Sequence, residues 1–225
     1  MFLTKLELNP RSREALRDLA QPYELHRTLA HAFPTPVGDD YRAAHGVLFR
    51  VEPASNYSAL PTVLVQSANA PTWEGLPADY LRQPAQCKPL ALILNYGQVL
   101  GFRLVANPTK KIAQEGQRQG KRVPLLNTGG SDEELPPAQQ WLRRKAELSG
   151  FEVLHVFSEA FTLHSASTTT APRSLAKQHL PLYGVRFDGL LRVQDPQRLI
   201  EVVAQGVGSA KSFGFGLLSL APAVS

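Results

Sequence analysis

The sequence predicts an α+β protein made of two ferredoxin-like domains in tandem. Short runs of alternating apolar and polar residues indicate strands, and segments that open on a proline or an N-cap residue and repeat apolar residues three and four apart indicate helices. Along each half these elements follow the order strand, helix, strand, strand, helix, strand, which is the ferredoxin-like order. We therefore expect one domain at 1–95 and a second at 98–225, although no sequence repeat relates them.

The first half opens on a strand whose apolar residues alternate with Thr4, Lys5 and Glu7. Asn9-Pro10 then predicts the cap of a helix, and Pro22 predicts the end of that helix and the start of the next. The elements expected here are a strand at 2–8, a helix through Leu16 and Leu19, a helix at 22–33, a hairpin of strands around 47–51 and 63–65, a short helix or loop at 73–80 and a strand at 89–94.

The second half repeats this order with longer connections. The elements expected here are a strand at 99–106, a helix from Pro136-Pro137 to about Gly150, strands around 151–157 and 183–193, a helix from Asp195-Pro196 and a last strand from Phe213 to Leu220. Two further segments, 110–131 and 163–181, are polar and carry several lysines and arginines. We expect both to be solvent-exposed loops whose positive charge favours contact with a phosphate backbone.

Composition excludes several classes of protein. The 225 residues carry a formal net charge of +5, which favours a polyanionic partner. The single cysteine, Cys87, excludes an internal disulfide and a cysteine-based zinc site, and the six histidines show no tight ligand spacing. We therefore expect no metal and no cofactor. Because the chain offers no signal peptide and no long apolar segment, we expect no membrane contact and a cytoplasmic location.

Four glycines stand within eleven residues near the C-terminus, at positions 206, 208, 214 and 216. Such a loop can present backbone N–H groups to an anion. The predicted order around it is helix, loop, strand, whereas the P-loop and the dinucleotide-binding loop both run strand, loop, helix. The pattern therefore predicts an anion-binding loop that is neither of these nucleotide motifs, or else a turn that only joins a helix to a strand.

The helix predicted at 22–33 carries the residues best suited to catalysis. At 3.6 residues per turn, Leu25 and Leu29 share one face, while Tyr23, His26 and Arg27 share the opposite one. Phosphodiester cleavage needs a group that moves a proton, a donor to the reacting oxygen and a positive charge, and these three side chains can supply them. A solvated helix face with an incidental histidine would show the same pattern.

Together these features resemble the CasE-type CRISPR endoribonucleases, which belong to the repeat-associated mysterious protein (RAMP) superfamily. The resemblance rests on Asn9-Pro10, the helix from Pro22 to Arg27, the segment Asn107-Pro108-Thr109-Lys110-Lys111 and the late glycine loop. It implies tandem RRM-like domains and a metal-independent cut within the hairpin of CRISPR precursor RNA, with the substrate 2′-OH as nucleophile. It also implies that the enzyme stays on its product as one of several Cascade subunits.

We assign His26 to proton transfer, Tyr23 to support or a second proton, and Arg27 to the phosphate. Which of His26 and Tyr23 is the acid and which the base stays open. The residues expected to bind RNA are Gly206, Gly208, Lys211, Ser212, Gly214, Gly216, Lys110, Lys111, Arg173 and Lys177. The alternative to an enzyme is a non-catalytic RNA-binding scaffold of the same superfamily, which would keep the glycine loop without needing the histidine.

Overall fold

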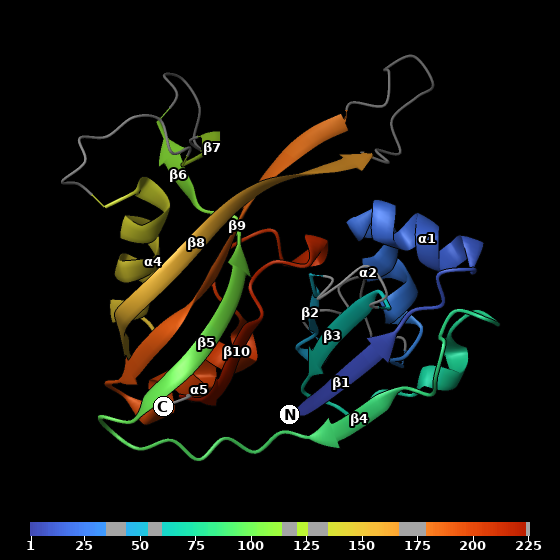
Figure 1. The fold of residues 1–225 in the computed structure, drawn as a ribbon, viewed down its shortest axis with the longest axis horizontal. Coiled ribbons are helices and arrows are strands. Elements are labelled where there is room, and N and C mark those ends of the chain that lie inside the picture. Colours follow the sequence, from blue (N-terminus) through green and yellow to red (C-terminus); the bar gives the residue numbers. More distant parts are fainter. Residues whose placement is uncertain (35–43, 54–59, 114–120, 126–134, 167–178, 224–225) are drawn as a thin grey trace.

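A computed structural model of the protein describes residues 1–34, 44–53, 60–113, 121–125, 135–166 and 179–223. In this part of the chain, two four-stranded antiparallel sheets lie side by side, as Figure 1 shows, and a separate hairpin forms a third sheet of two strands. An extended segment along the lower edge of that view joins the last strand of the first sheet to the first strand of the second.

The first sheet is built from the N-terminal part of the chain. Its strands, in spatial order, are β2 (Leu48–Val51), β3 (Thr62–Ser67), β1 (Phe2–Glu7) and β4 (Gln86–Pro89), and all neighbours are antiparallel. The helices α1 (Arg13–Ala20) and α2 (Pro22–Ala30) form one core with it, in which Leu6, Leu25 and Leu29 are fully buried. The short helix η1 (Trp73–Gly75) takes the place of a second long helix.

The second sheet comes from the C-terminal part. Its strands, in spatial order, are β10 (Leu218–Pro222), β5 (Val99–Ala106), β9 (His179–Val193) and β8 (Phe151–Ala166), again all antiparallel. The helices α4 (Pro137–Glu147) and α5 (Pro196–Gln205) contribute Trp141, Leu142 and Leu199 to its core. Counted along the chain within each sheet, the first and third strands are central, and the second and fourth strands form the edges. This arrangement confirms the predicted α+β class with two ferredoxin-like units.

Two helix ends differ from the prediction. The helix α1 is capped by Ser12, whose Oγ accepts from the Ala15 N–H at 3.3 Å, and not by Asn9. The Asn9 side chain instead accepts from the Arg11 N–H at 3.0 Å, which forms a tight turn ahead of the helix. The helix α2 ends at Ala30, three positions earlier than predicted, and the chain turns at His31.

Two predicted strands begin or end elsewhere. The fourth strand covers Gln86–Pro89, whereas the predicted residues 90–94 form no strand. Leu92 and Leu94 pack on the second core while Ile93 is exposed, so the alternation there reflects contact with the other sheet and not a strand of the first. The last strand begins only at Leu218, because Gly214 and Gly216 have φ angles of +84° and +94°, which interrupt extended backbone.

The prediction of two loops was wrong in part. Within 110–131, β6 (Thr109–Ile112) pairs with β7 (Lys121–Pro124) as a two-stranded hairpin. Within 163–181, β8 continues to Ala166 and β9 starts at His179, so these strands reach further than their apolar cores. Ladder hydrogen bonds explain both extensions, since they form regardless of side-chain polarity. Arg173 and Lys177 lie outside the described residues.

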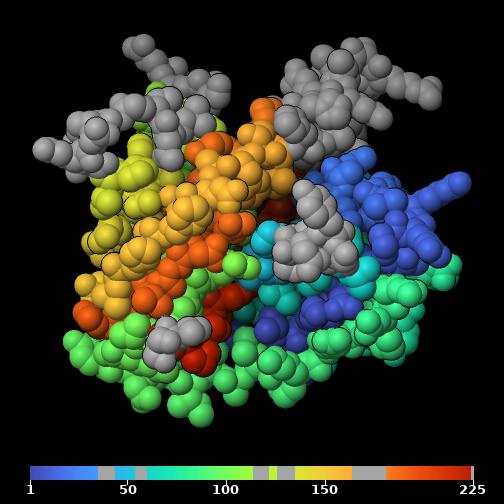
Figure 2. Space-filling model, in the orientation of Figure 1, coloured from blue at the N-terminus to red at the C-terminus, as the bar shows by residue number. Residues whose placement is uncertain are grey.

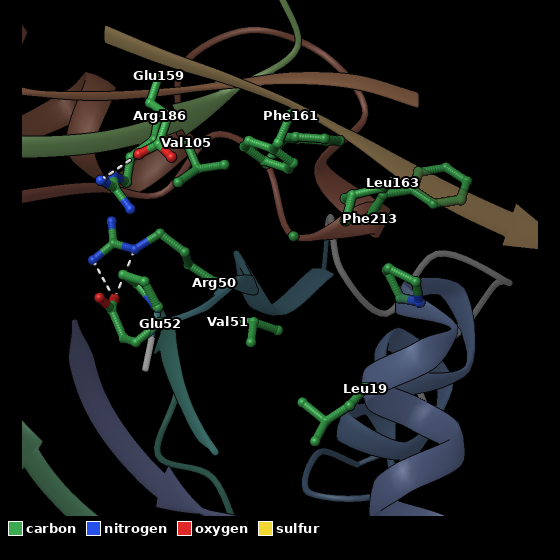
Figure 3. Close-up of a pocket in the computed structure, with 14 residues that line it drawn as sticks. Leu19, Arg50, Val51, Glu52, Val105, Glu159, Phe161, Leu163, Arg186 and Phe213 are labelled. Atoms are coloured by element: carbon green, nitrogen blue, oxygen red, sulfur yellow. Dashed lines mark hydrogen bonds and ion pairs between the residues drawn. The ribbon is translucent and has the colours of Figure 1, made fainter. Parts of the chain in front are cut away.

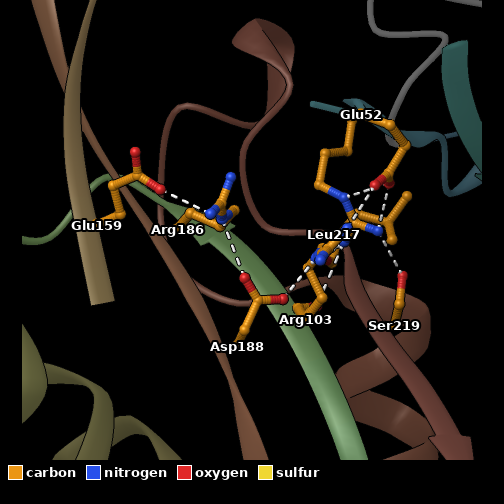
Figure 4. A network of polar contacts seen from close by, with 8 residues as sticks. Glu52, Arg103, Glu159, Arg186, Asp188, Leu217 and Ser219 are labelled. Atoms are coloured by element: carbon orange, nitrogen blue, oxygen red, sulfur yellow. Dashed lines mark hydrogen bonds and ion pairs between the residues drawn. The ribbon is translucent and has the colours of Figure 1, made fainter. Parts of the chain in front are cut away.

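A buried arginine joins the two sheets. Arg50 of β2 donates from Nη1 to the Leu217 carbonyl at 3.1 Å and to the Arg103 carbonyl at 3.3 Å, and from Nη2 to Ser219 Oγ at 3.0 Å (Figure 4). Its Nε donates to Glu52 at 2.7 Å. Burial lowers the pKa of Arg50, and the charge of Glu52 opposes that effect. The boundary at 95–98 stays a prediction, because side chains from both halves share these contacts.

Candidate functional site

The helix α2 positions the predicted catalytic pair. Pro22 occupies its first turn, and the fully buried Leu25 and Leu29 fix which face turns to the core. Tyr23 is 38% exposed, and its ring lies 6.0 Å from that of His26 at an interplanar angle of 20°. The phenol and the imidazole therefore lie side by side on α2, as the periodicity predicted. Only the phenol is exposed, because His26 is half-buried and the Nε2 edge of its ring is covered by protein.

The glycine loop meets this helix. Its short helix η2 (Lys211–Phe213) packs against α2, and the Phe213 ring lies 5.9 Å from the Tyr23 ring. On the other side, the His26 ring lies 6.3 Å from that of Phe49 in β2. The fold thus brings together the two motifs that the sequence carries at opposite ends. In Figure 2 the blue helices of the N-terminal part lie near the gold and orange strands β8 and β9.

Arg27 lies at the solvent edge of the same helix. Its side chain is 64% exposed, and its Nη1 forms an ion pair with Glu24 at 3.3 Å, one turn earlier. An exposed pair of this kind contributes little to stability and exchanges readily with other partners. The guanidinium can therefore turn to a phosphate without unfolding the helix.

Several glycine-loop amides donate within the chain. Gly206 N–H donates to the Val202 carbonyl at 2.7 Å, Gly216 N–H to the Val105 carbonyl at 2.7 Å, and Gly214 N–H to the Lys211 carbonyl at 3.2 Å. The Lys211 ammonium donates to the Gln205 carbonyl at 2.6 Å. In this conformation these groups hold the loop in shape, which differs from the expectation that they face an anion.

Another part of the loop borders a basic pocket of about 260 Å³. The residues that line it come from β6, β7, α4 and the loop, and include Asn107, Thr109, Lys111, Arg122, Trp141, Lys145, Gly208 and Ser209. Three of them are cations and none is acidic, so its field suits an anion such as a phosphate. Lys110 is exposed on β6 next to Lys111 but points to the other side of the strand.

Sequence reasoning missed several of these residues as site residues. Phe213 lies inside the glycine loop, so its position was visible, but nothing marked it as a partner of Tyr23. Phe49 and Lys145 belong to a strand and a helix that the sequence did predict, yet they carry no local signal of a site. Of the ten residues expected to bind RNA, Lys111 and Gly208 line the same pocket, as described above.

Two further observations bear on the type of protein. The described residues contain no group of three or more His, Cys, Asp or Glu side chains that could hold a metal ion. Within the same part of the chain, no helix has the length and apolar character needed to cross a membrane.

The fold and site define a class: a tandem ferredoxin-like α+β protein with a Tyr–His pair against a C-terminal glycine loop and a basic pocket nearby. The sequence profile of the family described as "CRISPR associated protein" matches residues 1–222. This chain belongs to that family, in its CasE-type branch, as its relatives establish.

The relatives match over their whole length. The CRISPR-associated endoribonuclease Cse3 of Thermus thermophilus is 37% identical over 99% of this chain and 100% of its own. The CRISPR system Cascade subunit CasE of Escherichia coli K12 is 33% identical over 99% of this chain and 100% of its own. A structure of the endoribonuclease Cse3 bound to a 19-nucleotide RNA superposes with a TM-score of 0.83, at 37% identity, covering 99% of this chain and 100% of that one.

Proposed function

We propose that the protein is a metal-independent endoribonuclease that cuts CRISPR precursor RNA within the repeat hairpin and stays bound to the product as a subunit of a Cascade complex in the cytoplasm. Full-length relatives that are a CRISPR-associated endoribonuclease and a Cascade subunit support this proposal. The single observation that carries it for this chain is the Tyr23–His26 pair on α2, whose exposed tyrosine packs against the glycine loop.

In the proposed reaction the 2′-OH of the nucleotide before the cut attacks the neighbouring phosphorus. One group of the pair takes the 2′ proton, the P–O5′ bond breaks, and the other group gives a proton to the leaving 5′ oxygen. The products are a cyclic 2′,3′-phosphate and a 5′-OH. His26 is suited to either step at neutral pH, since an imidazole ordinarily titrates near there, while Tyr23 is the better donor. Arg27 stabilises charge on the phosphate.

The proposed RNA contacts divide into two groups. In the first group, the basic pocket with Lys111 and Gly208 binds the phosphate backbone of the hairpin, because the positive charges of its cations act together. The part of the loop with Lys211, Ser212 and Gly214 lies beside α2 and supports the reacting nucleotide from its own side. These contacts position the RNA, while the Tyr–His pair carries out the chemistry.

The test uses a labelled repeat hairpin with the wild-type protein in excess EDTA. We expect cleavage to continue in the chelator, and a 2′-deoxy nucleotide before the cut to abolish it. A requirement for added Mg²⁺ or Mn²⁺, or cleavage of the 2′-deoxy RNA, would contradict the mechanism. Tight binding of the hairpin without any cleavage would instead favour the scaffold alternative.

A further inference from the structure

A cavity of about 330 Å³ lies directly beside the Tyr–His pair. Pro22, the first residue of α2, and Phe213, which contacts the Tyr23 ring, both form part of its wall. It therefore borders the place where the scissile phosphate must lie if Tyr23 and His26 act on it. Its volume is at the small end of the roughly 300–1,000 Å³ that is usual for ligand sites.

One wall of the cavity is aromatic. Phe161 of β8 and Phe215 stack with ring centres 6.3 Å apart at 25°, and Phe213 lines the cavity further along, toward α2 (Figure 3). The absence of a side chain at Gly184, which pairs with Phe161 across the strands, makes room for these rings. A Cβ there would come within 2.5 Å of Phe161 and 2.9 Å of Phe215. The sheet is thus shaped to let the Phe161 ring lie flat.

The opposite wall is aliphatic, with Leu19 and Val51 from the N-terminal part of the chain. A flat apolar object of the thickness of one ring would touch aromatic groups on one side and aliphatic groups on the other. Nucleobases have this shape, and single-stranded RNA is commonly recognised by stacking unpaired bases on aromatic side chains.

A third wall is polar and offers both kinds of hydrogen-bonding group. Arg186 Nη2 forms an ion pair with Glu159 at 2.6 Å, and its Nε pairs with Asp188 at 3.0 Å. The Glu159 side chain is 56% exposed and that of Arg186 is 26% exposed, so this wall meets solvent. A base whose edge reaches it would find carboxylate acceptors and guanidinium donors side by side, the groups that read base edges.

We propose that this cavity binds one unpaired nucleobase of the RNA, from a nucleotide that flanks the scissile phosphate, stacked on Phe161 and Phe213 with its edge toward Glu159 and Arg186. This proposal rests on the proposed endoribonuclease function. Holding that base outside the hairpin stem fixes the adjoining ribose and phosphate against α2, so the cavity acts on both positioning and base preference.

The test is a double-mutant cycle that combines a change in the RNA with a change in the protein. Hairpins with an abasic ribonucleotide immediately before or immediately after the cut are compared with the intact hairpin, in wild type and in Phe161→Ala. We expect loss of one of these bases to slow single-turnover cleavage by wild type about 5- to 150-fold, the range for one base–aromatic stack of roughly 1–3 kcal/mol. Removal of the same base should slow cleavage by Phe161→Ala only slightly, because the ring on which that base stacks is already absent.

Phe157→Ala provides the matched control. Phe157 lies four positions earlier on β8, is 58% exposed and does not line the cavity. Base removal should therefore slow cleavage by this variant as much as it slows cleavage by wild type. Equal costs in wild type and Phe161→Ala at both RNA positions would overturn the proposal. If base removal slows cleavage equally in the two proteins and Phe161→Ala also fails to bind other Cascade subunits, the occupant of the cavity is a protein side chain. That result would overturn the proposal as well.

A second variant decides the matter if Phe161→Ala does not fold. Glu159→Gln alters an exposed side chain and keeps its shape, but replaces a pure acceptor by a group that also donates. Base preference at the sensitive nucleotide should change, measured with all four bases at that position. An unchanged preference would overturn the proposed edge contact and with it the cavity assignment. Failure of wild type to cut any repeat hairpin would instead overturn the endoribonuclease function itself.

Discussion

At the scale of single residues, Tyr23 is exposed while its neighbour His26 is half-buried, and packing fixes the position of both rings. The fully buried Leu25 and Leu29 anchor the helix beneath them, and His26 lies at the border of this core while Tyr23 lies outside it. Phe49 and Phe213 contact the pair from its two sides and limit the directions in which the rings can turn. Such packing is what a catalytic pair needs to hold its geometry.

His26→Ala should therefore separate chemistry from binding. We expect cleavage to slow by roughly 10²- to 10⁴-fold, the usual contribution of one acid–base group, while hairpin affinity barely changes. The measurement is single-turnover cleavage together with a binding titration. His31→Ala, an exposed histidine at the end of the same helix, is the control and should cut at the wild-type rate. Wild-type cleavage by His26→Ala would remove this residue from the mechanism.

At the scale of elements, the glycine loop shapes the site mainly by packing. A Cβ on Gly214 would lie 3.1 Å from the Phe49 ring, which in turn contacts His26. Gly214 also has a φ of +84°, a conformation that side chains rarely adopt. The loop thus couples its own backbone geometry to the position of the imidazole.

Gly214→Ala should lower the cleavage rate more than it lowers hairpin affinity, because it displaces Phe49 and with it His26. The matched control is Gly97→Ala, which meets the same kind of backbone strain at a φ of +77° but has no atom within 4 Å of the new Cβ. Both variants should lose about 1 kcal/mol of stability to backbone strain, and Gly214→Ala should lose more because it also displaces the buried Phe49. Only Gly214→Ala should lose rate, and equal rates in the two variants would contradict the proposed coupling.

The hairpin of β6 and β7 gives a second prediction for an element. Lys111 lines the basic pocket, whereas Lys110 points to the other side of β6. Lys111→Ala should weaken hairpin binding and reduce the slope of log affinity against log salt by about 0.7–0.9, as expected for one lost phosphate contact. Lys110→Ala should change that slope less. Equal slopes in both variants would indicate a diffuse charge effect in place of a pocket.

At the scale of the whole molecule, the two sheets are held together by a buried charge network. The Arg50 side chain is 3% exposed and bonds to Glu52, just past the end of β2, and to carbonyls of β5 and the segment before β10. Arg103 links Glu52 at 3.0 Å to Asp188, which also pairs with Arg186 beside the cavity (Figure 4). Loss of one member would leave buried polar groups without their partner.

Arg50→Met should cost about 3–5 kcal/mol of unfolding free energy, measured by urea denaturation, because the Leu217 and Arg103 carbonyls would lose their buried donor and the half-buried Glu52 would keep Arg103 but lose Arg50 as a partner. Arg192→Met is the control. Arg192 pairs with Glu152 at 3.0 Å, but both side chains are nearly half exposed, so its loss should cost less than about 1 kcal/mol. Similar costs for the two variants would show that the network does not hold the sheets together.

The sequence alone determined the fold class, the order of most elements, the family resemblance and the face of α2 that carries Tyr23 and His26. All of these depend on local rules: a period of two in strands, 3.6 residues per turn in helices, and the fixed backbone geometry of proline. It placed strand ends less well, since ladder hydrogen bonds carried β8 and β9 into polar sequence.

Only the tertiary structure decided what surrounds the catalytic pair. Arg50 and Leu217 are separated by 167 positions, and Tyr23 and Phe213 also come from opposite ends of the chain, so neither contact leaves a trace in local periodicity. The same holds for the pocket that joins Lys111 to Gly208 and for the cavity beside Phe161. The cavity beside Phe161 forms where the two separately patterned sheets meet, and the basic pocket forms where β6, β7, α4 and the glycine loop come together. Side-chain packing between distant segments sets the shape of each.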